Sequence, residues 1–294
     1  MNIHEKGAIF MSYQDYANSK YVFLIGNGIN RIGGSQDISW QQILENFEVN
    51  SQLSYVDGYP LPEFFELLSL YNRDGVDTLH RTQFVEAIDA LVGNDYHKEV
   101  YQFCSRHHID ILTTNFDHAF QKTNNLVKAS TRKLDKKFTD FYPWQVFYTE
   151  QGHKNSDQGI RLFHINGDQY YKRSLKLTVK DYAGNITYFN RRYNPLQKNS
   201  KYANDETWIN CFFDKDVIIF GLALGDEEIF IRNVLIQRAL YRKKMKINGT
   251  SGYYLYCTQD FKDDTTLAQY TLFFKAVGIA MVPYETYHAI YERK

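Results

Sequence analysis

Two polar segments in the middle of the sequence carry the side chains best suited to catalysis. Asn115 stands in TTNFD, directly after the apolar run Ile109–Thr113, and His164 stands in FHINGD, near the end of another apolar run. An amide can orient a water molecule or a ribose hydroxyl, and an imidazole can accept a proton near neutral pH. A lone histidine is more often structural, but a position at a predicted strand end favours a catalytic role. We therefore predict Asn115 and His164 as the catalytic residues.

Two glycine-rich segments follow other apolar runs and could bind a nucleotide. Gly26–Asn30 is GNGIN, and Gly221–Asp226 is GLALGD. Glycines let backbone N–H groups approach a pyrophosphate closely. Asp117 and Asp226 could orient ribose hydroxyls, or they could cap the helices that follow them. The predicted ligand-binding residues are Gly26, Asn27, Gly28, Ile29, Asn30, Thr114, Asp117, Gly221, Leu224 and Asp226.

The apolar runs alternate with helical patterns along the chain. Strands are predicted at Tyr21–Gly26, Ile109–Thr113, Ile160–Ile165 and Asp216–Phe220, and shorter ones at 253–257 and 280–283. This alternation predicts an α/β fold, namely a Rossmann-like doubly wound parallel sheet. Ligands of such sheets bind beyond the carboxyl ends of the strands, so the four polar segments would meet at one edge.

The connections between these strands complete the predicted organisation. The length fits a single domain over 1–294, with helical patterns at 48–106 forming an insertion after the first strand. The segment 27–39 is predicted as a loop and 124–159 as a mostly irregular connection. A hairpin is predicted within 172–200, with Gly184 and Asn185 as its turn.

The composition excludes several classes of protein. Because 34 Lys and Arg balance 34 Asp and Glu, the formal charge of zero argues against a dedicated nucleic-acid binder. The sequence has no apolar run of about 18 residues and no apolar leader, so we expect neither a membrane span nor a signal peptide. The three cysteines lie far apart, and no His, Cys, Asp and Glu set has familiar metal-ligand spacing. We therefore expect a cytoplasmic protein without a bound metal.

Taken in order, the four segments resemble the motifs of the sirtuin-like superfamily, in particular its bacterial antiphage-defence branch. GNGIN (Gly26–Asn30) is similar to the GAGxS-type loop of that family, and TTNFD (Thr113–Asp117) is similar to its TQNxD or TTNxD motif. HING (His164–Gly167) is similar to the motif of the catalytic histidine, and GLALGD (Gly221–Asp226) to a later glycine motif. The order and the approximate spacing both fit over about 21–226.

Two departures from the family pattern affect the expected site. Asn27 and Asn30 stand where the family has alanine and serine, which changes the expected phosphate or ribose contacts. The four-cysteine zinc module of deacylating sirtuins is missing, as it is in the defence proteins that hydrolyse NAD. The resemblance therefore points to the NAD-hydrolysing branch.

The resemblance implies an activity, a substrate and partners. It implies cleavage of the nicotinamide–ribose bond of NAD to nicotinamide and ADP-ribose, with Asn115 positioning the ribose or the water and His164 acting as base. It implies antiphage defence by NAD depletion. Because unrestrained NAD loss would be toxic, we expect gating by a homo-oligomer or a companion defence protein. Two alternatives stay open: a sensor that binds NAD or ADP-ribose without turnover, and an NAD-dependent protein deacylase.

Overall fold

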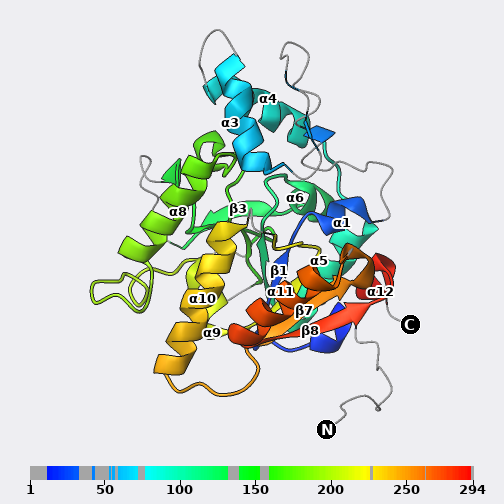
Figure 1. Cartoon of the computed structure of the whole chain (residues 1–294), viewed down its shortest axis with the longest axis vertical. Coiled ribbons are helices and arrows are strands. Elements are labelled where there is room, and N and C mark those ends of the chain that lie inside the picture. Colours follow the sequence, from blue (N-terminus) through cyan, green and yellow to red (C-terminus); the bar gives the residue numbers. More distant parts are fainter. Residues whose placement is uncertain are drawn as a thin grey trace.

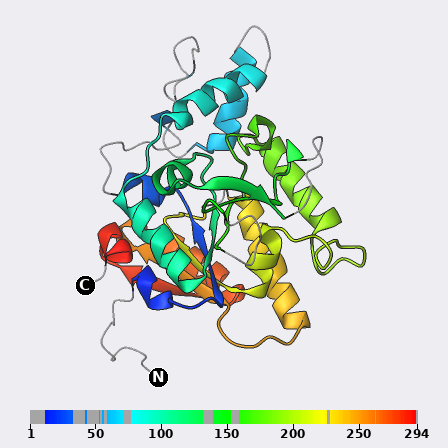
Figure 2. The same cartoon turned by 180° about the vertical axis from the view of Figure 1, so that it is seen from behind.

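An eight-stranded sheet forms the centre of the computed structural model, which describes residues 12–32, 42–43, 53, 55–56, 59–71, 77–131, 139–152, 159–225, 228–261 and 263–292 (Figures 1 and 2). The strand order is β3-β4-β5-β2-β1-β6-β7-β8. The strands are β1 (Tyr21–Ile25), β2 (Asp110–Thr113), β3 (Val127–Ser130), β4 (Val146–Thr149), β5 (Leu162–His164), β6 (Asp216–Phe220), β7 (Gly252–Cys257) and β8 (Ile279–Tyr284).

Strand β1 lies at the centre and pairs in parallel with β2 on one side and β6 on the other. The sheet continues in parallel to β5 beyond β2 and to β7 and β8 beyond β6, and only β3 and β4 run antiparallel. The chain therefore builds the sheet outward in two directions from β1. This confirms the predicted α/β, Rossmann-like doubly wound sheet, with its switch point beside β1.

Helices cover both faces of the sheet, because alternate strand residues point to opposite sides. On one face, residues such as Val22 and Leu24 join a core with four helices: α8 (Val179–Arg192), α9 (Trp208–Asp214), α10 (Ile229–Lys244) and α11 (Asp264–Ala276). On the other face, Phe23 and Ile25 join a second core with shorter elements and one long helix. These are η1 (Tyr13–Tyr16), α1 (Gly28–Arg31), α5 (Asp95–His107), α6 (Ala119–Asn124) and α12 (Tyr287–Tyr291).

Two helices form a lobe above the sheet edge that carries the polar segments. These are α3 (Leu61–Tyr71) and α4 (Asp77–Asp89), at the top of the view in Figure 1. Their apolar residues form a third core, to which Phe116 of the TTNFD segment belongs. The ring of Phe116 lies edge-on to that of Phe84, with 5.7 Å between centroids. The lobe is therefore packed directly against a predicted site segment.

The predicted hairpin within 172–200 is wrong, because its central part is helix α8. Thr178 and Asp181 form a capping box: the Thr178 hydroxyl accepts from the backbone of Asp181, and the Asp181 carboxylate accepts from the backbone of Thr178. This start signal and the burial of Phe189 outweigh the local turn preference of Gly184 and Asn185. A Gly-Asn pair does not by itself decide between a turn and a helix.

Two other predicted connections also contain regular structure. The segment 124–159, predicted as mostly irregular, holds the antiparallel pair β3 and β4. The start of the predicted loop at 27–39 is the helical turn α1, while 33–39 lie outside the described residues. Strand β3 lies at the sheet edge with exposed or half-buried residues, so it lacks the apolar pattern of a buried strand.

Candidate functional site

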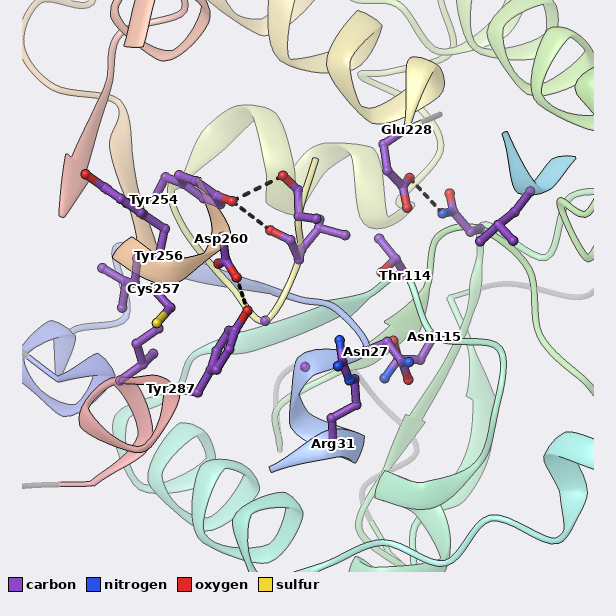
Figure 3. Close-up of a pocket in the computed structure, with 18 of the residues that line it drawn as sticks. Asn27, Arg31, Thr114, Asn115, Glu228, Tyr254, Tyr256, Cys257, Asp260 and Tyr287 are labelled. Carbon is purple, nitrogen blue, oxygen red and sulfur yellow. Dashed lines mark hydrogen bonds between the residues drawn. The ribbon is translucent and has the colours of Figure 1, made fainter. Parts of the chain in front are cut away.

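A cavity of about 440 Å³ opens where the carboxyl ends of β1, β2, β6 and β7 meet (Figure 3). Asn27 and Gly28 line it after β1, Asn115 after β2 and Gly221 after β6, and Cys257 lines it from the end of β7. This is the position at which doubly wound sheets bind their ligands, and the volume lies within the range of small-molecule sites. Asn166 of the HING segment lines it as well, so residues from all four polar segments meet at one cavity.

The glycines of the first and fourth segments bring two backbones into contact. A Cβ atom on Gly26 would lie 2.4 Å from the carbonyl oxygen of Gly221. A Cβ atom on Gly28 would lie 2.6 Å from the Cα atom of Gly221. The backbone N–H of Gly28 donates to the Gly221 carbonyl at 2.8 Å, and that of Gly26 donates to Phe220 at 3.1 Å. These two N–H groups are therefore used to join the two loops, and the pyrophosphate contacts of this segment stay a prediction.

Asn115 is fixed through its main chain and turns its amide toward the cavity. Its backbone N–H donates to the hydroxyl of Thr113 at 3.1 Å, and that hydroxyl donates to the carbonyl of Ile25 at 3.0 Å. Asn115 is buried and lines the cavity. Its Nδ2 atom has no hydrogen-bond partner among the described residues. A buried amide donor without a partner carries a desolvation cost that a bound ligand would relieve.

His164 lies directly behind Asn115 and does not line the cavity. Its Nδ1 lies 2.6 Å from the backbone carbonyl of Asn115, and its Nε2 lies 2.5 Å from the amide nitrogen of Gln121. A carbonyl only accepts, so Nδ1 carries the proton and Nε2 accepts from Gln121. Burial lowers the pKa of His164, which keeps the ring neutral. The predicted pair is adjacent, but only the amide lies at the cavity.

A second group of polar side chains surrounds His164 and was missed in the sequence. His118 contacts Asp168 at 2.7 Å, and the hydroxyl of Tyr148 donates to the same carboxylate at 2.6 Å. Against the effect of burial, these hydrogen bonds lower the pKa of Asp168 to about 2. His118, His164 and Asp168 place donor atoms within 4.8 Å of one another, but His164 could become a metal ligand only if Gln121 released its Nε2 atom. The fold brings these donors together from separate segments, which sequence spacing could not show.

Asn30 and Asp117 belong to a polar network beneath α1 rather than to the main cavity. The Asn30 amide donates to Asp117 at 2.9 Å and to Asn27 at 2.8 Å, and its oxygen accepts from Nε2 of His97 at 2.9 Å. Asp117 also accepts from the backbone of Ala119 at 2.9 Å, at the start of α6. Asp117 thus accepts from the first residue of α6, although His118 is the N-cap residue of that helix. Asn30 does not line the main cavity, and its phosphate contact stays a prediction. Asp117 and Asn115 also line a narrow pocket of about 20 Å³ beside α4.

The remaining predicted ligand-binding residues divide between cavity and core. Thr114 lines the cavity. Ile29 and Leu224 are fully buried, each within one of the two cores that flank the sheet, and they do not line the main cavity. Their ligand contacts stay a prediction. Asp226 lies outside the described residues.

The far end of the cavity consists of residues that were not predicted. Tyr254, Tyr256 and Cys257 come from β7, Asp260 from η4 (Thr258–Asp260) and Tyr287 from α12. The surrounding protein raises the pKa of Asp260 by desolvation. No motif marks these residues in the sequence, because they meet only once β7 and α12 are folded.

Charged side chains are few among the described residues that line the cavity. Arg31, on α1, is the only lysine or arginine in that set. The acidic residues of the set are Glu228 and Asp260. Glu228 accepts a hydrogen bond from Asn166 of the HING segment at 3.3 Å. Arg31 follows the first glycine segment directly, which is the one signal by which it could have been found in the sequence.

Comparisons with known proteins give no family for the chain: no protein-family model matches it, and no curated protein matches it. The resemblance to the sirtuin-like superfamily therefore rests on the four motifs. Among the described residues, no helix has both the length and the apolar character needed to cross a membrane.

Proposed function

We propose that the chain is an NAD hydrolase that cleaves the nicotinamide–ribose bond, in a sirtuin-like site without a zinc module. The observation that carries this proposal is the Asn115 amide, buried without a partner among the described residues at a cavity of about 440 Å³. The cavity lies at the switch point of a doubly wound sheet, where nucleotides bind. The motif order supports NAD as that nucleotide.

The chemistry of the reaction suits the side chains at this end of the cavity. Nicotinamide leaves as a neutral molecule from a cationic glycoside, so no acid has to protonate it, unlike the leaving oxygen of ordinary glycosides. The site has to hold the ribose and orient a water molecule, which the amide of Asn115 can do. Arg31 offers the positive charge that a diphosphate requires. Both features support the proposal of NAD as the ligand.

His164 acts on the reaction through Asn115 in this proposal. Its Nδ1–H group holds the Asn115 carbonyl, and its ring is shielded from the cavity. A catalytic base has to reach the proton that it removes, directly or through one water. A direct role as base therefore requires the loop after β5 to move in the active state. This arrangement agrees with an enzyme that a partner or an assembly switches on.

The same observation favours one second candidate, a sensor that binds NAD or ADP-ribose without turnover. In that case the buried ring of His164 has a structural role, and the cavity binds the nucleotide without cleaving it. The two candidates differ in product formation when the cavity is saturated with NAD. Antiphage defence by NAD depletion belongs to the first candidate alone.

The experiment that tests the proposal is mass spectrometry of NAD, nicotinamide and ADP-ribose in cells that express the chain with its genomic neighbours, with and without phage. We expect NAD loss on infection with the wild-type chain, and at least about 100-fold slower loss with Asn115→Ala. A matched control is Asn204→Ala, at an exposed residue that does not line the cavity. Undiminished NAD loss with Asn115→Ala would refute the proposed role of this residue.

A further inference from the structure

The end of the cavity at β7 has a different chemistry from the end at Asn115. Tyr254 and Tyr256 stack with 5.8 Å between centroids and 12° between planes. The hydroxyl of Tyr254 donates to the carbonyls of Leu222 at 3.0 Å and Ala223 at 3.2 Å, so the rings and the loop after β6 form one fixed wall. The ring of Tyr254 is buried and stacks on Phe274 with 4.3 Å between centroids, so the half-buried ring of Tyr256 is the aromatic surface of this wall that remains for a purine base.

An acid lies beside this aromatic wall and is held in place. The hydroxyl of Tyr287 donates to Asp260, and Figure 3 shows the two side chains meeting at the cavity. This contact joins the segment after β7 to α12. The carboxylate keeps further acceptor positions beyond the one that Tyr287 uses.

Arg31 sets the direction in which NAD would lie. In Figure 3 it is drawn between Asn115 and the pair of Asp260 and Tyr287. A diphosphate at Arg31 leaves the nicotinamide ribose toward Asn115 and the adenosine toward β7. Asp260 then lies beside the ribose of the adenosine. Arg31 also acts electrostatically on Asp260. No second lysine or arginine lines the cavity among the described residues, so with a diphosphate bound at Arg31 no other cation is left there for a further phosphate.

We infer that Asp260, held by Tyr287, selects an adenosine ribose with a free 2′-hydroxyl, so that the cavity accepts NAD and ADP-ribose and rejects their 2′-phosphorylated counterparts. A carboxylate accepts hydrogen bonds from ribose hydroxyls, as the acid of dinucleotide-binding folds does. The same carboxylate repels a phosphate at that position. The inference rests on the proposed function, since it takes NAD as the ligand.

The test is isothermal titration calorimetry of the purified full chain with two probes, ADP-ribose and 2′-phospho-ADP-ribose. We expect wild-type protein to bind ADP-ribose at least about ten-fold more tightly than the 2′-phosphorylated probe. Asp260→Asn should bring the two affinities within about three-fold of each other. Tyr287→Phe should reduce the ratio less, because it frees the carboxylate without removing its charge. Asp264→Asn, an exposed acid on α11 outside the cavity lining, removes the same charge and should leave the ratio unchanged.

Each outcome supports or overturns the inference. Equal binding of both probes by wild-type protein, or an unchanged ratio in Asp260→Asn, overturns it. The absence of binding for both probes also overturns it, together with the assignment of the cavity to NAD. Discrimination in binding without any NAD cleavage in cells supports the inference, while it refutes the hydrolase and leaves the sensor.

Discussion

Asn115 is fixed through its main chain and presents its side chain to the cavity. Thr113 and His164 hold its backbone N–H and carbonyl, which leaves the side-chain amide as the part of the residue that faces the cavity. The residue lies at the strand end where the motif places it and lines the cavity, while its catalytic role stays a prediction. The placement of His164 behind it could not be predicted, because the motif gives a strand end and not the side to which a ring turns.

At the residue scale, His97 should make the stability of the protein depend on pH. Burial lowers its pKa from 6.5 to about 4, with a smaller opposing effect of Asp117. Below pH 6.5 the unfolded chain binds a proton at this histidine and the folded chain does not, so stability falls as pH drops toward 4 and is fully present above 6.5. This shift in pKa lowers the free energy of unfolding by roughly 3 kcal/mol between neutral pH and pH 4. Thermal unfolding from pH 8 to pH 4 measures it.

The variant His97→Gln should show a smaller loss of melting temperature between pH 6.5 and pH 4. Burial of His164 acts in the same direction, so part of the loss remains. The control is His108→Asn, since this residue is exposed with φ 55°, a conformation that asparagine tolerates. An identical pH dependence in His97→Gln and wild-type protein would show that the buried ring does not contribute in this way.

At the scale of elements, the sequence predicts strands well where both faces are buried. Strands β1, β2 and β6 are mostly apolar and almost entirely buried, because a central parallel strand has no solvent face. Strand β3 was missed, since its residues are exposed or half-buried at the sheet edge. Helix α8 was missed because a short-range signal at Gly184 competes with a capping box six residues before it. Tertiary packing decides such cases.

The junction between β1 and β6 gives a prediction at this scale. In Gly28→Ala the new methyl group would lie 2.6 Å from the Cα atom of Gly221, and backbone cannot move aside as a side chain does. We expect a loss of about 1–3 kcal/mol in the free energy of unfolding, measured by urea denaturation, and weaker ADP-ribose binding. Gly184→Ala is the matched control, because its methyl group would meet only the Tyr142 hydroxyl, at 3.3 Å.

Alanine at 184 should leave stability unchanged or raise it, since alanine is favoured over glycine in a helix. If residues 184 and 185 instead formed the turn of the hairpin predicted from the sequence, the same variant would destabilise the protein. Equal destabilisation by both substitutions would mean that the contact between the two loops is not the feature that requires glycine at 28.

At the scale of the whole molecule, the lobe of α3 and α4 connects the surface to the site. Leu61 and Pro62, at the start of α3, line the cavity, and Phe116 beside Asn115 packs into the core of the lobe. Arg81 of α4 is tied to α8 by an ion pair with Asp181 at 2.6 Å and a hydrogen bond to the Leu175 carbonyl at 2.7 Å. A partner that shifts the lobe would therefore move part of the cavity wall.

The last prediction is that the purified chain binds ADP-ribose but hydrolyses NAD slowly. The reason is that the ring of His164 has both nitrogens engaged and is shielded from the cavity, so the resting site offers an amide without a base. Adding a companion protein that activates the chain, or conditions that assemble it, should raise the rate by about 100-fold or more, the contribution of a positioned base. Single-turnover measurement of nicotinamide release checks this. Rapid hydrolysis by the isolated chain as a monomer would contradict gating, and the loop after β5 would then have to open without help.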